Sequence, residues 1–146
     1  MSYIGCVWSF FACASFCFVF HIRGKMMFWT SAGGALGWFV FLLLSPVGND
    51  IVQCFFASMA TAAYSEVMAR VFKKPATPFQ VIALIPMVPG GGIFYTMEYC
   101  VIGNSGKFLE TGLHTLGIAG ALAMGVLLVS TFVRMAGMAA AGGERK

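Results

Sequence analysis

The chain has 146 residues, of which 60% are hydrophobic and only 10% are charged, and its mean hydropathy is +0.87. A soluble domain normally carries about 25% charged residues, so this composition excludes a water-facing surface over most of the molecule. The net charge of +4 comes from short basic clusters between apolar runs, which is typical of membrane topology and not of a nucleic-acid surface. We therefore expect an integral membrane protein, with residues 1–146 forming a single transmembrane domain.

Five apolar runs follow one another along the chain. A transmembrane helix needs roughly 20 mostly apolar residues, so we expect about five of them in an all-α membrane fold. Their approximate bounds are 3–20, 26–44, 51–70, 79–102 and 113–132, with an earlier start of the last one near Lys107 left open. The first run has no basic segment before it and no A-x-A cleavage site, so we expect a retained helix and not a signal peptide.

Turn and capping residues mark where these helices begin and end. Asp50 with Gln53 three residues later resembles a capping box at the start of the third helix. Thr77 as N-cap with Gln80 at the third helical position predicts the start of the fourth helix. Gly103 is a plausible C-cap for that helix. The tail after residue 134 is small and basic, and we expect it to be frayed.

Small residues indicate faces where helices pack closely, because no hydrophobic force drives helices together in lipid. The middle of the third helix, residues 57–65, is small and polar, which predicts a position inside the assembly. Gly33 and Gly37 form a G-x-x-x-G pair in the second helix. Three small residues spaced by four share one face of the fifth helix: Gly117, Ala121 and Gly125.

The cysteines all lie in apolar runs: Cys6, Cys13, Cys17, Cys54 and Cys100. They form no C-x-x-C pair, and none flanks a histidine at the spacing of a zinc site. We interpret them as small packing residues, and we expect no disulfide, no metal site and no cofactor.

The distribution of lysine and arginine predicts the orientation in the membrane. Eight of them lie in alternate connections of a five-span arrangement: Arg23, Lys25, Arg70, Lys73, Lys74, Arg134, Arg145 and Lys146. Only Lys107 lies on the other side. The positive-inside rule then puts the C-terminus in the cytoplasm and the N-terminus outside. A re-entrant fourth helix would reduce the bias to five against four, so full crossing is favoured.

The fourth apolar run contains residues that break helices, in the sequence "IPMVPGGGIFYTMEY" (85–99). Val88 precedes a proline and is pushed away from the α region, so we expect the first half-helix to end by about Met87. A non-helical link over Pro89, Gly90, Gly91 and Gly92 near the bilayer midplane follows, and a second half-helix begins near Ile93.

Such a break predicts a substrate site. Unwound backbone is tolerated at membrane depth only where protein buries it or a wet cavity receives it, as in the broken helices of secondary transporters. The N-terminus of the second half-helix carries a partial positive charge that suits a carboxylate. The candidate substrate-binding residues are Pro89, Gly90, Gly91, Gly92, Tyr95 and Thr96. A kink that serves packing alone is the alternative.

Few ionisable residues lie in the apolar runs. Glu98 could carry a coupling proton, or it could be an interfacial acid in an aromatic belt. Glu66 with Arg70 four residues later fits a surface ion pair. His114 could shuttle protons, although a capping or interfacial role is favoured. Ser58 is a further candidate hydrogen-bond donor to a substrate.

Two stretches, "VIALIPMVPGGGIFYTM" and "LHTLGIAGALAMGVLLVS", resemble the bacterial threonine/serine exporter family, and more narrowly its smaller, C-terminal-half subunit. The family's IP-x-x-PGG turn is Ile85 to Gly91 here, and the resemblance covers roughly Pro78 to Ser130. One departure is Gly103-Asn104-Ser105, where some relatives have an Asp shortly after the turn.

The resemblance implies a subunit of a secondary transporter in the bacterial inner membrane. Its substrates would be small carboxylate-bearing metabolites, either threonine- and serine-like amino acids or dicarboxylates, and a proton or ion gradient would drive their export. The implied partner is a larger membrane subunit of the same family, with a homo-oligomer as the alternative. The competing function is a structural or regulatory membrane subunit with no substrate of its own. An enzyme is not expected, because G-x-S-x-G, H-E-x-x-H and paired intramembrane aspartates are all missing from the sequence.

Overall fold

The regular structure is entirely helical over residues 4–22 and 24–143, which are the residues that the computed structural model describes. The α-helices are α1 (Ile4–Val19), α2 (Lys25–Leu43), α3 (Asp50–Phe72), α4 (Ala76–Leu84), α5 (Gly90–Ile102) and α6 (Ser105–Gly143). Two short 3-10 helices, η1 (Ser45–Val47) and η2 (Ile85–Met87), follow α2 and α4. The all-α prediction is confirmed for these residues.

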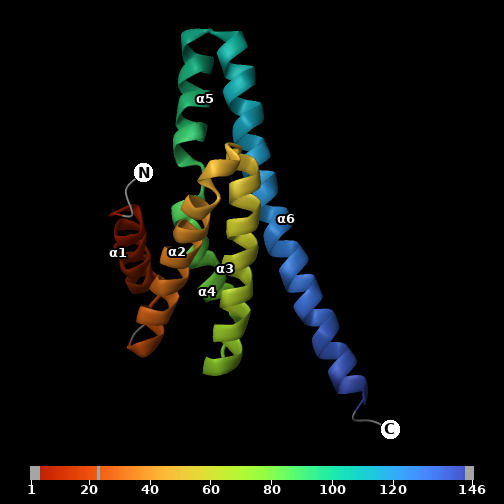
Figure 1. Ribbon diagram of the computed structural model, residues 1–146. Coiled ribbons are helices and arrows are strands. Elements are labelled where there is room, and N and C mark those ends of the chain that lie inside the picture. Colours follow the sequence, from red (N-terminus) through yellow and green to blue (C-terminus); the bar gives the residue numbers. More distant parts are fainter. Residues whose placement is uncertain (1–3, 23, 144–146) are drawn as a thin grey trace.

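The helices form a bundle and a hairpin that projects from it. Figure 1 shows α1, α2, α3 and α4 side by side, with α6 passing along α3. Beyond the turn between α2 and α3, α5 and the first part of α6 continue as an antiparallel pair. The 39 residues of α6 make it about 58 Å long at the rise of an α-helix, so it belongs to both the hairpin and the bundle.

Two predicted helix starts differ from the structure. Asn49, and not an Asp50–Gln53 box, caps α3, because its side-chain oxygen accepts a hydrogen bond from the Ile51 amide at 3.1 Å. α4 begins at Ala76 after Pro75, whose extended backbone leads into the helix, and no side chain caps it. The predicted cap Thr77 therefore lies inside the first turn. The predicted end of the fourth segment is confirmed, since Gly103 adopts the left-handed conformation (φ 77°).

The tail was predicted to fray after residue 134, but α6 continues to Gly143. The reason is local: residues 134–143 contain alanine and methionine, which favour a helix, and no proline to end it. Four residues used in the sequence predictions lie outside the described ranges: Tyr3, Arg23, Arg145 and Lys146.

The number of membrane spans stays a prediction. Among the described residues, α2 and α6 are each long and apolar enough to cross a bilayer, and the bent pair of α4–η2 with α5 adds a third if it is one span. α1 is apolar but has only 16 residues, or about 24 Å of helix. α3 is long enough at 23 residues, but its small polar residues and its charges lower its hydropathy. The expected number of about five membrane spans therefore requires that α1 and α3 also cross the bilayer.

α3 lies at the centre of the bundle, as its small side chains predict. It packs against α2, α4 and α6, and it buries eight residues: Gln53, Cys54, Ala57, Ser58, Thr61, Ala62, Ser65 and Ala69. The buried hydroxyls are satisfied within the helix; for example, Thr61 donates to the Ala57 carbonyl at 2.8 Å and Ser65 donates to the Thr61 carbonyl at 2.9 Å. The hydroxyls of Ser58, Thr61 and Ser65 therefore lie in the core with their donors paired.

The predicted glycine faces are close contacts between helices. A Cβ on Gly37 of α2 would lie 2.6 Å from the Thr61 hydroxyl of α3, and Gly33 meets the Tyr64 ring in the same way. On α6, Gly117 faces Ile51, Ala121 is buried, and Gly125 touches Ser58. The interpretation of both stripes as packing surfaces is confirmed.

Candidate functional site

The fourth segment is broken where the prolines predict. α4 passes into η2, which contains Pro86, and the axis then turns by 54° into α5. Val88 is extended (φ −61°, ψ 128°), as expected for a residue before proline. The first half-helix therefore ends at Met87, in agreement with the prediction.

The glycines, by contrast, are helical. We expected Pro89, Gly90, Gly91 and Gly92 to form the link, but α5 begins at Gly90, and only Val88 and Pro89 lie between the two halves. The Ile93 amide donates to the Pro89 carbonyl at 3.1 Å, which closes the first turn of α5. Glycine has little conformational preference of its own, so it is compatible with a helix as well as with a turn. The Ile93–Pro89 hydrogen bond places the three glycines in the first turn of α5.

The first turn of α5 is open. No side chain caps it, and by helix geometry the Gly91 and Gly92 amides have no acceptor within the helix. A side chain added at Gly90 or Gly91 would meet nothing within 4 Å, whereas Gly92 lies against Thr115 of α6. The partial positive charge of this helix end is therefore accessible from the side of Gly90 and Gly91.

A cavity of about 200 Å³ lies beside the break. It is lined by Trp38 and Phe41 of α2, Asp50 and Cys54 of α3, Ile118 of α6 and residues 86–89. Sequence reasoning treated Asp50 only as a helix cap, and no motif marks it otherwise. Since Asp50 begins α3, the break lies near one end of the α2–α3 pair. The predicted position at the bilayer midplane stays a prediction, and this arrangement puts the break nearer a membrane face if α2 and α3 both span.

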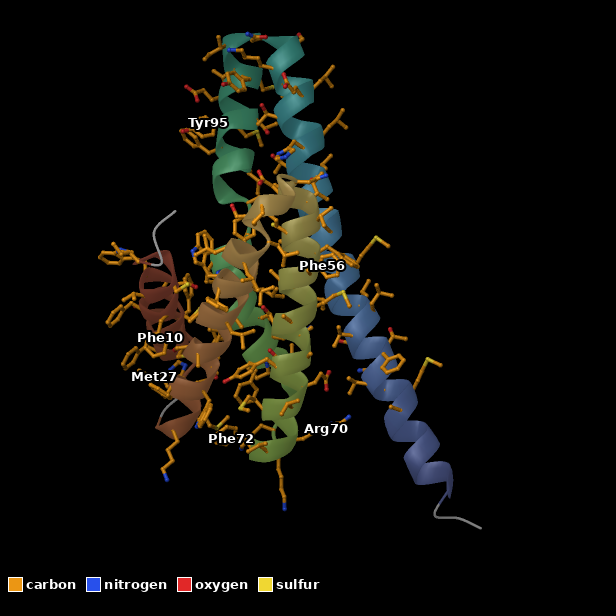
Figure 2. The ribbon with its side chains drawn as sticks, viewed as in Figure 1. Phe10, Met27, Phe56, Arg70, Phe72 and Tyr95 are labelled. Atoms are coloured by element: carbon orange, nitrogen blue, oxygen red, sulfur yellow. The ribbon has the colours of Figure 1, made fainter. Side chains whose placement is uncertain are left out.

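The polar residues of α5 do not converge on this cavity. Tyr95 is 53% exposed and projects away from α6 (Figure 2), and Glu98 is also exposed. Thr96 donates to the Gly92 carbonyl at 2.7 Å and faces a separate cavity of about 420 Å³ between α5 and α6. That cavity has a largely apolar lining that includes Met97. Of the predicted substrate-binding residues, only Pro89 lines the cavity beside the break, and Glu98 does not line it.

Other predicted candidates lie elsewhere. Ser58 is fully buried, donates to the Phe55 carbonyl at 2.8 Å and packs on Gly125, so it is a packing residue. Glu66 lines a polar cavity between α3, α4 and α6, and Arg70, its expected partner, is not part of that lining. His114 is exposed on α6.

Three of the cysteines, Cys13, Cys17 and Cys54, are buried packing residues, as predicted, whereas Cys6 is partly exposed and Cys100 is exposed. All five are free thiols. Cys13 of α1 is fully buried, lies against Gly34 of α2 and donates to the Ile82 carbonyl of α4 at 3.3 Å. Cys13 therefore contacts both α2 and α4, and its hydrogen bond links α1 directly to α4 just before the break.

The fold is that of a helical membrane protein with a discontinuous helix, an arrangement that secondary transporters use. The sequence pattern of the family described as "Threonine/Serine exporter, ThrE" matches residues 5–132. The chain therefore belongs to the threonine/serine exporter family, and the resemblance drawn from the IP-x-x-PGG turn is confirmed. Searches among curated proteins and among solved structures found no match.

Proposed function

We propose that this chain is one subunit of a secondary transporter that exports small carboxylate-bearing metabolites, either threonine- and serine-like amino acids or dicarboxylates. The family match over residues 5–132 carries the proposal, because it includes the whole broken helix. A proton or ion gradient would supply the free energy of export. The chain would act in the bacterial inner membrane.

The substrate carboxylate would meet the open end of α5. The amides of Gly91 and Gly92 lack helical acceptors, and Gly90 and Gly91 have no neighbour to block approach. Pro89 sets the direction of this helix end by forcing Val88 into an extended conformation. These features support a role for the break in binding, and Asp50 beside it supplies a carboxylate that could exchange protons or bind a cation.

A partner chain would complete the site. α5 buries none of its residues, and it exposes large apolar side chains including Phe94 and Val101. The larger membrane subunit of the same family is the partner we propose, with a second copy as the alternative. Such a partner would cover Tyr95 and Glu98, which would give Glu98 a protected position for proton coupling.

The orientation follows from the basic residues. Figure 1 shows the α1–α2 turn, the α3–α4 turn and the C-terminal end of α6 at one end of the molecule, and the α5–α6 turn at the other. Lys73 and Lys74 lie at the first end and Lys107 at the second. This arrangement supports a cytoplasmic C-terminus and an external N-terminus.

The test is export by cells that carry Gly91→Leu together with the partner subunit. Gly91 faces open space, so we expect the variant to fold and assemble normally and to lose export of threonine. Gly120→Leu is the matched control, because Gly120 also faces open space but lies on α6 and does not line the cavity beside the break. Normal export by Gly91→Leu would contradict the proposed site. Loss of assembly without a folding defect would indicate the structural or regulatory role instead.

A further inference from the structure

A second cavity, of about 540 Å³, lies between α3, α4 and α6. Glu66 lies about two helical turns before Lys73, so this cavity is close to the end of the bundle that we assign to the cytoplasm. Figure 1 shows α6 diverging from α3 toward this end. The polar lining comes from three helices: Glu66 of α3, Thr77 and Gln80 of α4, and Ser130, Thr131 and Arg134 of α6. The cavity shares no lining residue with the cavity beside the break.

The α6 side of this cavity changes from apolar to polar along one face of the helix. Five residues follow one another there at spacings that place them on the same face: Met124, Leu127, Ser130, Thr131 and Arg134. Met124 is 60% exposed and Leu127 is 63% exposed, whereas the three polar residues line the cavity. Arg134 lies about 15 Å beyond Met124 along the helix axis. An apolar track that ends in polar groups near a membrane face matches a molecule with an acyl chain and a polar headgroup.

Two opposite charges border the cavity in a chain with only 10% charged residues. Glu66 of α3 is half-buried, and Arg134 of α6 is exposed at the rim. Basic groups between transmembrane helices on the cytoplasmic side bind the phosphate of lipid headgroups. A headgroup that carries only a negative charge would satisfy Arg134 and would then face the Glu66 carboxylate. A headgroup that carries both a phosphate and an ammonium group satisfies both side chains.

Gln80 adds a hydrogen-bond donor without an acceptor. It lines the cavity from α4, and its side-chain nitrogen Nε2 is buried and has no hydrogen-bond acceptor among the described residues. A buried donor without a partner costs free energy, which a ligand oxygen placed at Gln80 recovers. The phosphate and the ester groups of a phospholipid both offer such oxygens.

We propose that this cavity binds the headgroup of phosphatidylethanolamine from the cytoplasmic leaflet. Arg134 binds the phosphate through paired N–H donors, and Glu66 accepts hydrogen bonds from the ammonium group. Gln80 donates to a phosphate or ester oxygen, and one acyl chain lies along Met124 and Leu127. The lipid fills the opening between α3, α4 and α6, and this role does not depend on the proposed export function.

The same contacts select among phospholipids. Phosphatidylcholine carries a positive charge too, but its quaternary ammonium group has no N–H to donate to Glu66. Phosphatidylglycerol offers only neutral hydroxyls beside its phosphate, so the Glu66 carboxylate gains no opposite charge. Hydrogen bonds between two charged groups are roughly twice as strong as those between neutral groups, so we expect phosphatidylethanolamine to bind most tightly.

The test is native mass spectrometry of the full-length protein in a neutral detergent, titrated with the dioleoyl forms of these three phospholipids. We expect one phosphatidylethanolamine molecule to bind with a Kd about tenfold lower than that of either other lipid. This comparison needs no variant. Equal affinity of the wild-type protein for phosphatidylethanolamine and phosphatidylcholine overturns the inference.

Variants of the lining residues test each contact. Gln80→Leu and Arg134→Gln should each weaken phosphatidylethanolamine binding about tenfold, as expected for loss of a hydrogen bond to a buried or charged group. Glu66→Gln should remove the preference for phosphatidylethanolamine over phosphatidylglycerol, and Glu66→Asp should retain it. Thermal unfolding establishes that each variant is folded.

Matched controls are Glu110→Gln and Lys107→Gln, which remove exposed charges at the other end of α6 and should leave lipid binding unchanged. Wild-type affinity and selectivity in folded Glu66→Gln and Arg134→Gln variants contradict the site.

Glycerophosphoethanolamine has the same headgroup without acyl chains, so it separates a lipid from a free phosphodiester. It should compete only at a concentration at least about a hundredfold higher, because it cannot bury apolar surface along α6. Leu127→Ser should weaken binding of the lipid and leave that of glycerophosphoethanolamine unchanged. Equal affinity for the two would make the free phosphodiester the ligand and would overturn the inference. Displacement of the bound lipid when the partner subunit assembles would make this cavity a subunit interface and would also contradict it.

Discussion

Gly92 of α5 and Thr115 of α6 lie in direct contact, so that a side chain on Gly92 would overlap the Thr115 hydroxyl. Thr115 is buried, and its hydroxyl donates to the Thr111 carbonyl at 2.7 Å, so it cannot easily move aside. This contact fixes the hairpin next to the break, while the neighbouring Gly91 faces open space. Two adjacent glycines of one motif therefore have different structural roles.

The first prediction uses this difference. Gly92→Leu should lower the free energy of unfolding by about 1–3 kcal/mol, because the new side chain forces α5 away from α6. Gly91→Leu should leave the unfolding temperature close to that of the wild type. Thermal unfolding of both variants in the same detergent, followed by tryptophan fluorescence, measures the effect. Equal unfolding temperatures for the two variants would show that α5 and α6 do not pack as described.

The second prediction concerns the contact between α3 and α6. A Cβ on Gly125 would overlap the Ser58 hydroxyl and would lie 2.8 Å from the Phe55 carbonyl. We expect Gly125→Ala to lower the free energy of unfolding by about 1–3 kcal/mol, because the backbone of α3 must shift.

Gly120→Ala is the control on the same helix, since Gly120 has no neighbour within 4 Å. It should be neutral or stabilise the helix by up to about 1 kcal/mol, the difference in helix propensity between the two residues. A Gly125→Ala variant as stable as Gly120→Ala would contradict the close approach of α3 and α6.

The third prediction concerns the bend. Pro89→Ala restores a backbone donor and removes the steric restriction on Val88. We therefore expect the angle between α4 and α5 to become smaller than the present 54°. Spin labels on cysteines introduced at the exposed positions Val81 and Val101 report this change.

Pulsed electron paramagnetic resonance should give a longer distance between the two labels in Pro89→Ala than in the parent protein. The parent protein for these labels carries substitutions of Cys6 and Cys100, because both thiols are at least partly exposed and would also be labelled. An unchanged distance would mean that packing against α3 and α6, and not the proline, sets the bend.

The fourth prediction concerns orientation. A fluorescent protein fused after the C-terminus should fold and fluoresce, because that end is assigned to the cytoplasm. Alkaline phosphatase inserted at Asn104, in the α5–α6 turn, should be active, because that turn is assigned to the outside. The reciprocal pair of fusions is the control, and activity of the phosphatase at the C-terminus would reverse the assignment.

Local chemistry explains which features of the fold were predictable. The apolar runs predicted the helices, since backbone groups in lipid must bond within their own segment. Val88 before Pro89 predicted the end of the first half-helix, because that restriction is steric and needs no tertiary contact. The start of α5 was wrong by about three residues, because glycine has little preference of its own and the Ile93–Pro89 hydrogen bond decided it.

The site was less predictable than the helices. Neither the three glycines nor the polar residues that follow them in α5 line the cavity beside the break. Asp50 lines that cavity from a helix that begins 36 residues before Pro86. Proximity along a helix gives no information about which other helix faces it, so neither arrangement could be read from the motif.

The sequence by itself determined a helical membrane protein of the exporter family, the break before Pro89 and the faces where small residues pack, because composition, proline sterics and side-chain size act locally. Only the tertiary structure decided that α5 leaves the bundle, that Asp50 lies beside the break, and that Glu66, Gln80 and Arg134 border one cavity. Those relationships depend on how helices far apart in the chain are placed against one another, and that placement is a property of the packed bundle as a whole.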